Sequence, residues 1–113
     1  MPGEYRKGAR LENEVKDILI EDGWAAVRAA GSHGIIDVMA DKYGEVWFIQ
    51  CRKGGYLSPG ERSELIALAK KHKAIPILAS KSKEGIVFEE VKPKRPEFHY
   101  EVIGGTFRKV PNG

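Results

Sequence analysis

Three polar residues interrupt stretches that otherwise have the pattern of buried β-strands, and they are the strongest candidates for chemistry in this chain. Asp37 lies within the apolar run 35–40, while Gln50 and Arg52 continue one face of the run 45–53. Side chains alternate along a strand, so Gln50 and Arg52 point the same way. If the two runs pair as strands through a turn at 41–44, Asp37 lies close to both.

Such a cluster would combine a carboxylate, an amide oxygen and a fixed cation, which suits a divalent metal. Mg²⁺ prefers oxygen ligands, and the Asp37 carboxylate, the Gln50 side-chain oxygen and the backbone carbonyl of Cys51 could supply them. Arg52 could then neutralise charge on a phosphate. A buried charge needs a partner, and a metal is not the only one possible. The structural alternative is a salt bridge between Asp37 and Arg52, with Gln50 at the end of a strand.

A further acid, Glu12, belongs to the helix that the pattern predicts over 10–22. Apolar residues recur there at the i, i+4, i+7, i+8 spacing of one helix face: Leu11, Val15, Ile18 and Leu19. Glu12 falls about 70° from the centre of this face, so it could reach a metal site from the helix. A solvated helix acid is the more common case at such a position.

The elements that would position these residues follow the order α-β-β-β-α-β-β, which predicts an α/β fold with a central mixed sheet flanked by helices. Residues 1–9 are expected to be loose, and strands are predicted over 24–30, 35–40, 45–53, 75–80 and 86–91. The second helix, from 58 to about 73, begins with the capping box Ser58-Pro59-Gly60-Glu61. The run 45–53 is apolar on both faces, which is typical of a covered central strand.

The last part of the chain has a different character. We take residues 1–91 as the core domain and 92–113 as a basic linker, Lys92-Pro93-Lys94-Arg95-Pro96, followed by a tail. Within the tail, 98–103 and 106–110 could pair as a hairpin across Gly104-Gly105. A disordered tail is the alternative.

Composition narrows the class of protein. The chain has 113 residues, enough for one domain. Its 42% hydrophobic and 31% charged residues are typical of a globular protein, and its net charge of +3 permits nucleic-acid binding without establishing it. Its one cysteine excludes an internal disulfide. The absence of a long apolar run and of a secretory pattern predicts no membrane association and a cytoplasmic location, in a host cell if the source is viral.

Taken together, these residues resemble the archaeal-type Holliday junction resolvases, within the PD-(D/E)XK nuclease superfamily. The match covers residues 5–91. It rests on Tyr5-Arg6-Lys7-Gly8-Ala9-x-x-Glu12, Val27-Arg28-x-Ala30-Gly31-Ser32, Asp37-Val38, Gln50-x-Arg52 and Ala74-Ile75-Pro76-Ile77-Leu78-Ala79. The resemblance implies a restriction-endonuclease-like core and a Mg²⁺-dependent endonuclease, with Mn²⁺ as a substitute. It also implies a homodimer that cuts four-way DNA junctions and leaves 3′-hydroxyl and 5′-phosphate ends.

The resemblance also implies roles for individual residues. Glu12 matches the family's helix acid, Asp37 its metal aspartate and Ser32 its loop serine. With Gln50 and the Cys51 carbonyl, the two acids would form the metal site. DNA contacts are expected from Arg6, Lys7, Arg10, Arg28, Ser32, His33 and Lys53.

Two positions depart from the family pattern. Gln50 stands where the family usually has glutamate, so the site loses a negative charge, which Glu12 could partly replace. Arg52 stands where the family usually has lysine; it stays protonated and cannot be a base, but it can stabilise charge on phosphate. Lys53 would need a β-bulge at Arg52 to reach the site. A working natural variant, an inactive relative and an engineered change all remain open.

We therefore expect a structure-selective endonuclease that resolves Holliday junctions by paired symmetric nicks. One site per chain predicts a homodimer, with the contact expected near the fifth and sixth predicted strands, at Ile86, Val87, Phe88 and Val91, and extended by residues 98–110. Two alternatives stay open. One is a nuclease of the same fold that acts on duplex or nicked DNA; the other, favoured by Gln50 and Arg52, is a non-catalytic junction- or DNA-binding relative.

Overall fold

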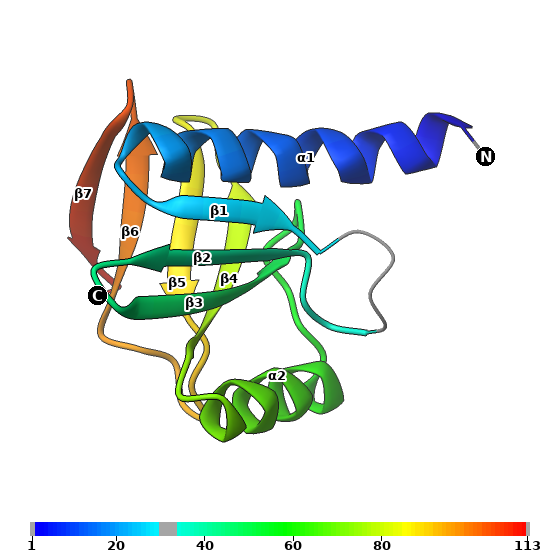
Figure 1. Ribbon diagram of the computed structural model, residues 1–113, viewed down its shortest axis with the longest axis vertical. Helices are drawn as coiled ribbons and strands as arrows, with labels where there is room; N and C mark the ends of the chain where they lie inside the picture. Colours follow the sequence, from blue (N-terminus) through cyan, green and yellow to red (C-terminus); the bar gives the residue numbers. More distant parts are fainter. Residues whose placement is uncertain (1, 30–33, 113) are drawn as a thin grey trace.

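The chain forms a seven-stranded sheet with a helix against each face, as seen in a computed structural model (Figure 1). The structure describes residues 2–29 and 34–112. The elements are α1 (Pro2–Glu21), β1 (Ala25–Arg28), β2 (Val38–Lys42), β3 (Glu45–Cys51), α2 (Pro59–Lys71), β4 (Ile75–Lys81), β5 (Ile86–Glu90), β6 (Phe98–Ile103) and β7 (Thr106–Pro111). The predicted order of the core elements is confirmed.

The strands lie in the sheet in the same order as in the sequence, from β1 to β7. Every neighbouring pair is antiparallel except β3 and β4, which are parallel and are connected through α2. A parallel pair requires a crossover connection, and a helix usually provides it. The sheet is therefore mixed, as predicted.

The hydrophobic core lies on both faces of β3, which confirms the prediction of a covered central strand. Trp47, Ile49 and Cys51 belong to the cluster that α1 covers, whereas Phe48 belongs to the cluster that α2 covers. The alternation follows from the period of two residues along a strand. Of the described residues, Gln50 is the one polar side chain buried in this core.

Helix α1 is longer than predicted, because residues expected to be loose continue it back to Pro2. Proline is tolerated in the first turn of a helix, where its missing N–H would have no partner. The two early glycines each cost only about 1 kcal/mol in helix propensity, so nothing between Pro2 and Glu21 stops the helix. Figure 1 shows the N-terminal part of α1 projecting beyond the end of β1.

Two strands near the candidate residues are shorter than predicted. β2 begins at Val38, so Asp37 precedes the strand instead of lying inside it. β3 ends at Cys51, because the Gly55 N–H donates to the Arg52 carbonyl (2.9 Å) and turns the chain there. Arg52 and Lys53 therefore lie in a turn, where the strand alternation used in the prediction no longer applies.

The C-terminal hairpin forms, and the alternative of a disordered tail is wrong. β6 pairs with both β5 and β7, so the hairpin extends the same sheet. Asn112 anchors the end of β7 by donating from its side chain to Glu89 (3.0 Å) and to the Pro96 carbonyl (2.8 Å).

This arrangement corrects the expected dimer surface. Ile86, Phe88 and Val91 are buried within the chain itself, at most 3% exposed. These three residues therefore offer no surface to a second copy, and Val87, the fourth expected residue, is half-buried. Across the described residues, neither helix is long and apolar enough to cross a bilayer.

The contact between the β4–β5 turn and β6 yields a stability prediction. Gly85 has φ +151°, and a Cβ there would lie 2.2 Å from the Val102 carbonyl oxygen. We expect Gly85→Ala to lower the free energy of unfolding by about 2 kcal/mol or more in a urea titration. Gly60→Ala is the control, because its Cβ meets nothing within 4 Å, and we expect it to stabilise helix α2 by about 0.5–1 kcal/mol. Equal stability of the two variants would contradict this packing.

Candidate metal and DNA site

The candidate site lies where β1 and β3 end and β2 begins. The Asp37 carboxylate accepts a hydrogen bond from the Cys51 backbone N–H (2.9 Å), and the Asp37 N–H donates to the Ile49 carbonyl (2.8 Å). The predicted pairing of β2 with β3 through the 41–44 turn is confirmed. It holds the Asp37 carboxylate at the end of β3.

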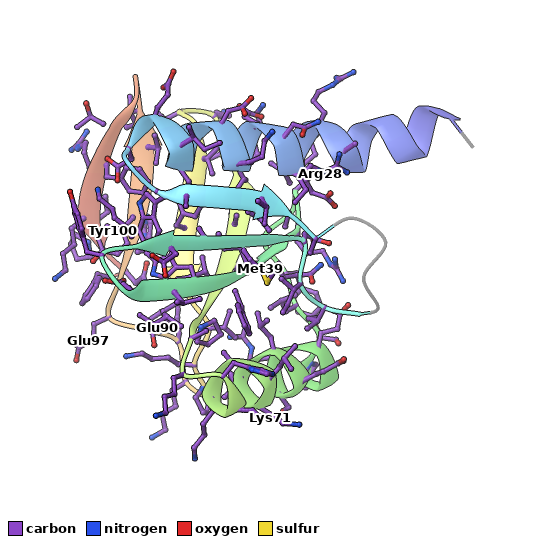
Figure 2. The ribbon with its side chains drawn as sticks, viewed as in Figure 1. Arg28, Met39, Lys71, Glu90, Glu97 and Tyr100 are labelled. Carbon is purple, nitrogen blue, oxygen red and sulfur yellow. The ribbon has the colours of Figure 1, made fainter. Side chains whose placement is uncertain are left out.

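Glu12 joins the site from α1. Its carboxyl group lies close enough to that of Asp37 to help raise the pKa of Asp37. Its Oε1 also accepts two hydrogen bonds from Arg28, from Nε at 3.1 Å and from Nη2 at 2.9 Å. Figure 2 shows Arg28 on the side of the sheet that faces α1. Glu12 is therefore not a solvated helix acid.

The surroundings of Asp37 disfavour its negative charge. Burial raises the pKa of this carboxyl group above its ordinary value, and the neighbouring Glu12 raises it further. The Cys51 N–H and the positive charge of Arg52 act in the opposite direction without cancelling the effect. A cation beside Asp37 and Glu12 would relieve this repulsion.

Gln50 provides a buried oxygen with no partner. Its side chain is 3% exposed, and its Oε1 accepts no hydrogen bond from any described residue. The pairing Val38↔Ile49, continued by one residue, places Asp37 opposite Gln50. Gln50 lies on the face of β3 away from α1, since Ile49 is in the α1 cluster, whereas Asp37 precedes β2 and its carboxylate turns to the Cys51 N–H. A buried acceptor without a donor costs about 1–3 kcal/mol, which a bound cation would offset.

These donors suit a hard divalent ion. Two carboxylates, an amide oxygen and the Cys51 carbonyl are oxygen ligands of the kind that Mg²⁺ prefers. Nowhere in the described part of the chain do three or more histidine, cysteine, aspartate or glutamate side chains form a metal-binding group. A metal site here therefore depends on Gln50 and on the backbone as well as on the two acids.

Arg52 pairs with an acid that the sequence analysis did not assign to the site. Its Nη2 donates to Oε2 of Glu61, in the first turn of α2. The expected structural alternative, a salt bridge with Asp37, is therefore not the arrangement that forms. The Arg52 side chain is 38% exposed, so part of the guanidinium remains accessible to a phosphate.

Cys51 contributes its backbone and not its thiol. Burial raises the pKa of the thiol well above its ordinary value, and the charges of Asp37 and Glu12 add to the shift. The thiol stays protonated and is no nucleophile. Cys51 is buried in the core.

The structure describes most but not all of the residues expected to contact DNA. Arg10 is exposed on α1 and Lys53 is exposed in the turn after β3, whereas Arg28 is held by Glu12. Arg6 and Lys7 belong to α1. Ser32 and His33 lie outside the described residues.

Two contacts could not be found by reading the sequence alone. The capping box marked Glu61 as the third residue of a helix, and the structure confirms it, but its pairing with Arg52 depends on where that helix docks. The Arg28–Glu12 pair depends in the same way on how α1 crosses β1.

Comparison with known proteins identifies the class. A family model described as archaeal Holliday junction resolvase (Hjc) matches residues 3–102. The "Crossover junction endodeoxyribonuclease Hjc" of Methanocaldococcus jannaschii is 31% identical over 124 residues, covering 92% of each chain. The solved structure of Archaeoglobus fulgidus Hjc, a Holliday junction resolvase, superposes with a TM-score of 0.68 at 25% identity, covering 94% of this chain and 84% of that one.

The mixed sheet with flanking helices is thus the restriction-endonuclease-like α/β fold, as predicted. The chain belongs to the archaeal Holliday junction resolvase family.

The orphaned Gln50 oxygen leads to a prediction about metal affinity. Gln50→Glu adds a charged ligand, so we expect it to bind Mg²⁺ about tenfold more tightly in a calorimetric titration, and Gln50→Leu to bind it more weakly. Glu84→Gln, a charge change at an exposed turn residue, serves as the control and should match the wild type. Identical Mg²⁺ affinity in all of these proteins would show that Gln50 is not a ligand.

Proposed function

We propose that this protein is a metal-dependent endonuclease that resolves four-way DNA junctions by paired nicks, acting inside the cell. The observation that carries the proposal is the joint position of Asp37, Glu12 and the unpartnered Gln50 oxygen at one end of the sheet. The family supports it, because the relatives that match along most of the chain are named as junction resolvases.

Asp37, Glu12, the Gln50 side-chain oxygen and the Cys51 carbonyl would hold the metal, Mg²⁺ or, as a substitute, Mn²⁺. When bound, the ion would polarise the scissile phosphate and activate the attacking water. The buried oxygens would hold it in a fixed place, because the Asp37 carboxylate is tied to the Cys51 N–H. Its charge would offset the repulsion between Glu12 and Asp37.

Arg52 supplies a permanent positive charge next to these ligands. An arginine guanidinium does not act as a base in proteins, so this group would stabilise charge that develops on the phosphate. Lys53, exposed in the same turn, and Arg10, exposed on α1, contact phosphates farther along the DNA. Ser32 and His33, which lie outside the described residues, are proposed to complete the DNA contacts.

A second candidate function is binding without cutting. Two observations favour it: Gln50 supplies no charge to the metal site, and Arg28 already occupies Glu12. The deciding experiment incubates a labelled four-way junction with the protein, in Mg²⁺ and in EDTA, beside linear and nicked duplex controls. We expect paired nicks in the junction in Mg²⁺ alone. Binding without cutting would favour the second candidate, and cutting of the duplex at equal rate would indicate another substrate.

We also propose a homodimer, because a four-way junction needs two symmetric cuts and the chain offers one such site. The face of β1 and β2 away from α1 suits the contact. Val27 and Met39 are paired across these strands and are 55% and 38% exposed. Helix α2 packs on β3 and β4 and does not cover Val27 and Met39. Figure 2 shows Met39 on the α2 side of the sheet. Because β1 ends at Arg28, this face borders the site.

The metal site predicts that binding and cutting can be separated. We expect Asp37→Asn to abolish cutting, because the variant loses a charged ligand, while junction affinity changes less than about threefold, since phosphate contacts elsewhere provide it. Nick formation and gel-shift affinity measure the two effects. Cutting at near the wild-type rate would remove Asp37 from the proposed site.

The dimer surface predicts a change in mass. Light scattering of the wild type at micromolar concentration should give about twice 12.6 kDa, and Met39→Glu should give the monomer, because a charge would enter an apolar contact. The control is Ile20→Glu, which alters an apolar side chain of α1 that is 48% exposed and should leave the dimer intact. A monomeric wild type, even with junction DNA, would contradict the homodimer.

A further inference from the structure

We propose that Glu61 is a positioning residue that holds Arg52 away from Asp37 and thereby keeps the Asp37 carboxylate available to the metal. The proposal rests on the function proposed above and adds a residue of α2 to the site. Glu61 acts through Arg52 and not on the substrate.

The geometry of Glu61 is unusual because its two oxygens have different partners. Oε1 accepts a hydrogen bond from the Ser58 backbone N–H (3.1 Å), and Oε2 accepts one from Arg52 Nη2. The Glu61 N–H in turn donates to the Ser58 side chain (3.2 Å), which completes the capping box. The carboxylate is therefore fixed by the first turn of α2 before it meets Arg52.

Arg52 needs such a partner. Its backbone is held by a bond from its N–H to the Ala79 carbonyl (2.9 Å), but its side chain is long and carries about 2 kcal/mol of rotamer entropy. The guanidinium has five N–H donors. One of them binds Glu61, and among the described residues the others have no further side-chain partner, so they are available to a phosphate.

The charges of the site explain why the partner must be an acid. Two carboxylates, Glu12 and Asp37, face two arginines, Arg28 and Arg52. Arg28 is bound to Glu12, so an unrestrained Arg52 would be drawn to Asp37, a carboxylate on which its charge already acts. Arg52 would then compete with the cation for Asp37. Glu61 offers Arg52 a negative partner on the opposite side and prevents this pairing.

The test is a double-mutant cycle read out by Mg²⁺ calorimetry. Glu61→Gln keeps an acceptor for the capping box, which tolerates glutamine, but it removes the charge that holds Arg52. We expect Mg²⁺ to bind this variant about three- to tenfold more weakly. Adding Arg52→Gln removes the competing cation, so the double variant should regain wild-type affinity or better. In the junction assay, Glu61→Gln should lower kcat with little change in KM, and in the Arg52→Gln background it should cause no further loss.

Ser58→Ala is the structural control. It removes the helix cap, and we expect it to lower the free energy of unfolding by about 1 kcal/mol without changing Mg²⁺ affinity. Unchanged Mg²⁺ affinity in Glu61→Gln, or a double variant that still binds Mg²⁺ weakly, would overturn the role of Glu61. Neither result would overturn the proposed function. A wild type that binds Mg²⁺ but does not cut would overturn the proposed function, while the affinity cycle would still decide the role of Glu61. A wild type that binds no Mg²⁺ would overturn both.

Discussion

The hydrogen bond from the Cys51 N–H to the Asp37 carboxylate joins the start of β2 to the end of β3. The rest of the site depends on this contact, because it holds an acid at a place where burial opposes its charge. Glu12 then approaches Asp37 from α1, and Gln50 lies opposite Asp37 in the continued register. Each of these oxygens comes from a different element. The pairing of β2 with β3 and the docking of α1 together create the cluster.

The site is also a balance of charges. Each acid at its centre has an arginine nearby, and each of those arginines has a carboxylate partner, Glu12 for Arg28 and Glu61 for Arg52. The net result leaves Asp37 without a salt-bridge partner among the described residues. The neutral Gln50 reduces the number of charges that must be compensated when no cation is present, and a buried glutamate in its place would add one more unpaired charge.

The sequence predicted the core elements and the central acids because these depend on local patterns. Residue periodicity identified β3 and its two covered faces, and the position of Asp37 in an apolar run identified a charge in need of a partner. The prediction was wrong where the pattern was weak. Residues 2–9 carry no apolar stripe, yet nothing there breaks a helix, so α1 continues through them. The partners of Arg28 and Arg52 depend on helix docking, which no local pattern encodes. The expected dimer surface was wrong because Ile86 and Phe88 were read as free before β6 was known to cover them.

The order of the strands in the sheet has a consequence for how the chain folds while it is being synthesised. Each strand lies beside its neighbours in sequence, from β1 to β7, so no strand waits for a distant part of the chain before it can pair. Short loops close at low entropic cost. The longest connection between paired strands is the one from β3 to β4, because it contains α2. During synthesis, the sheet can therefore grow strand by strand from its N-terminal edge, and the residues of the candidate site are in place well before the C-terminal hairpin is added.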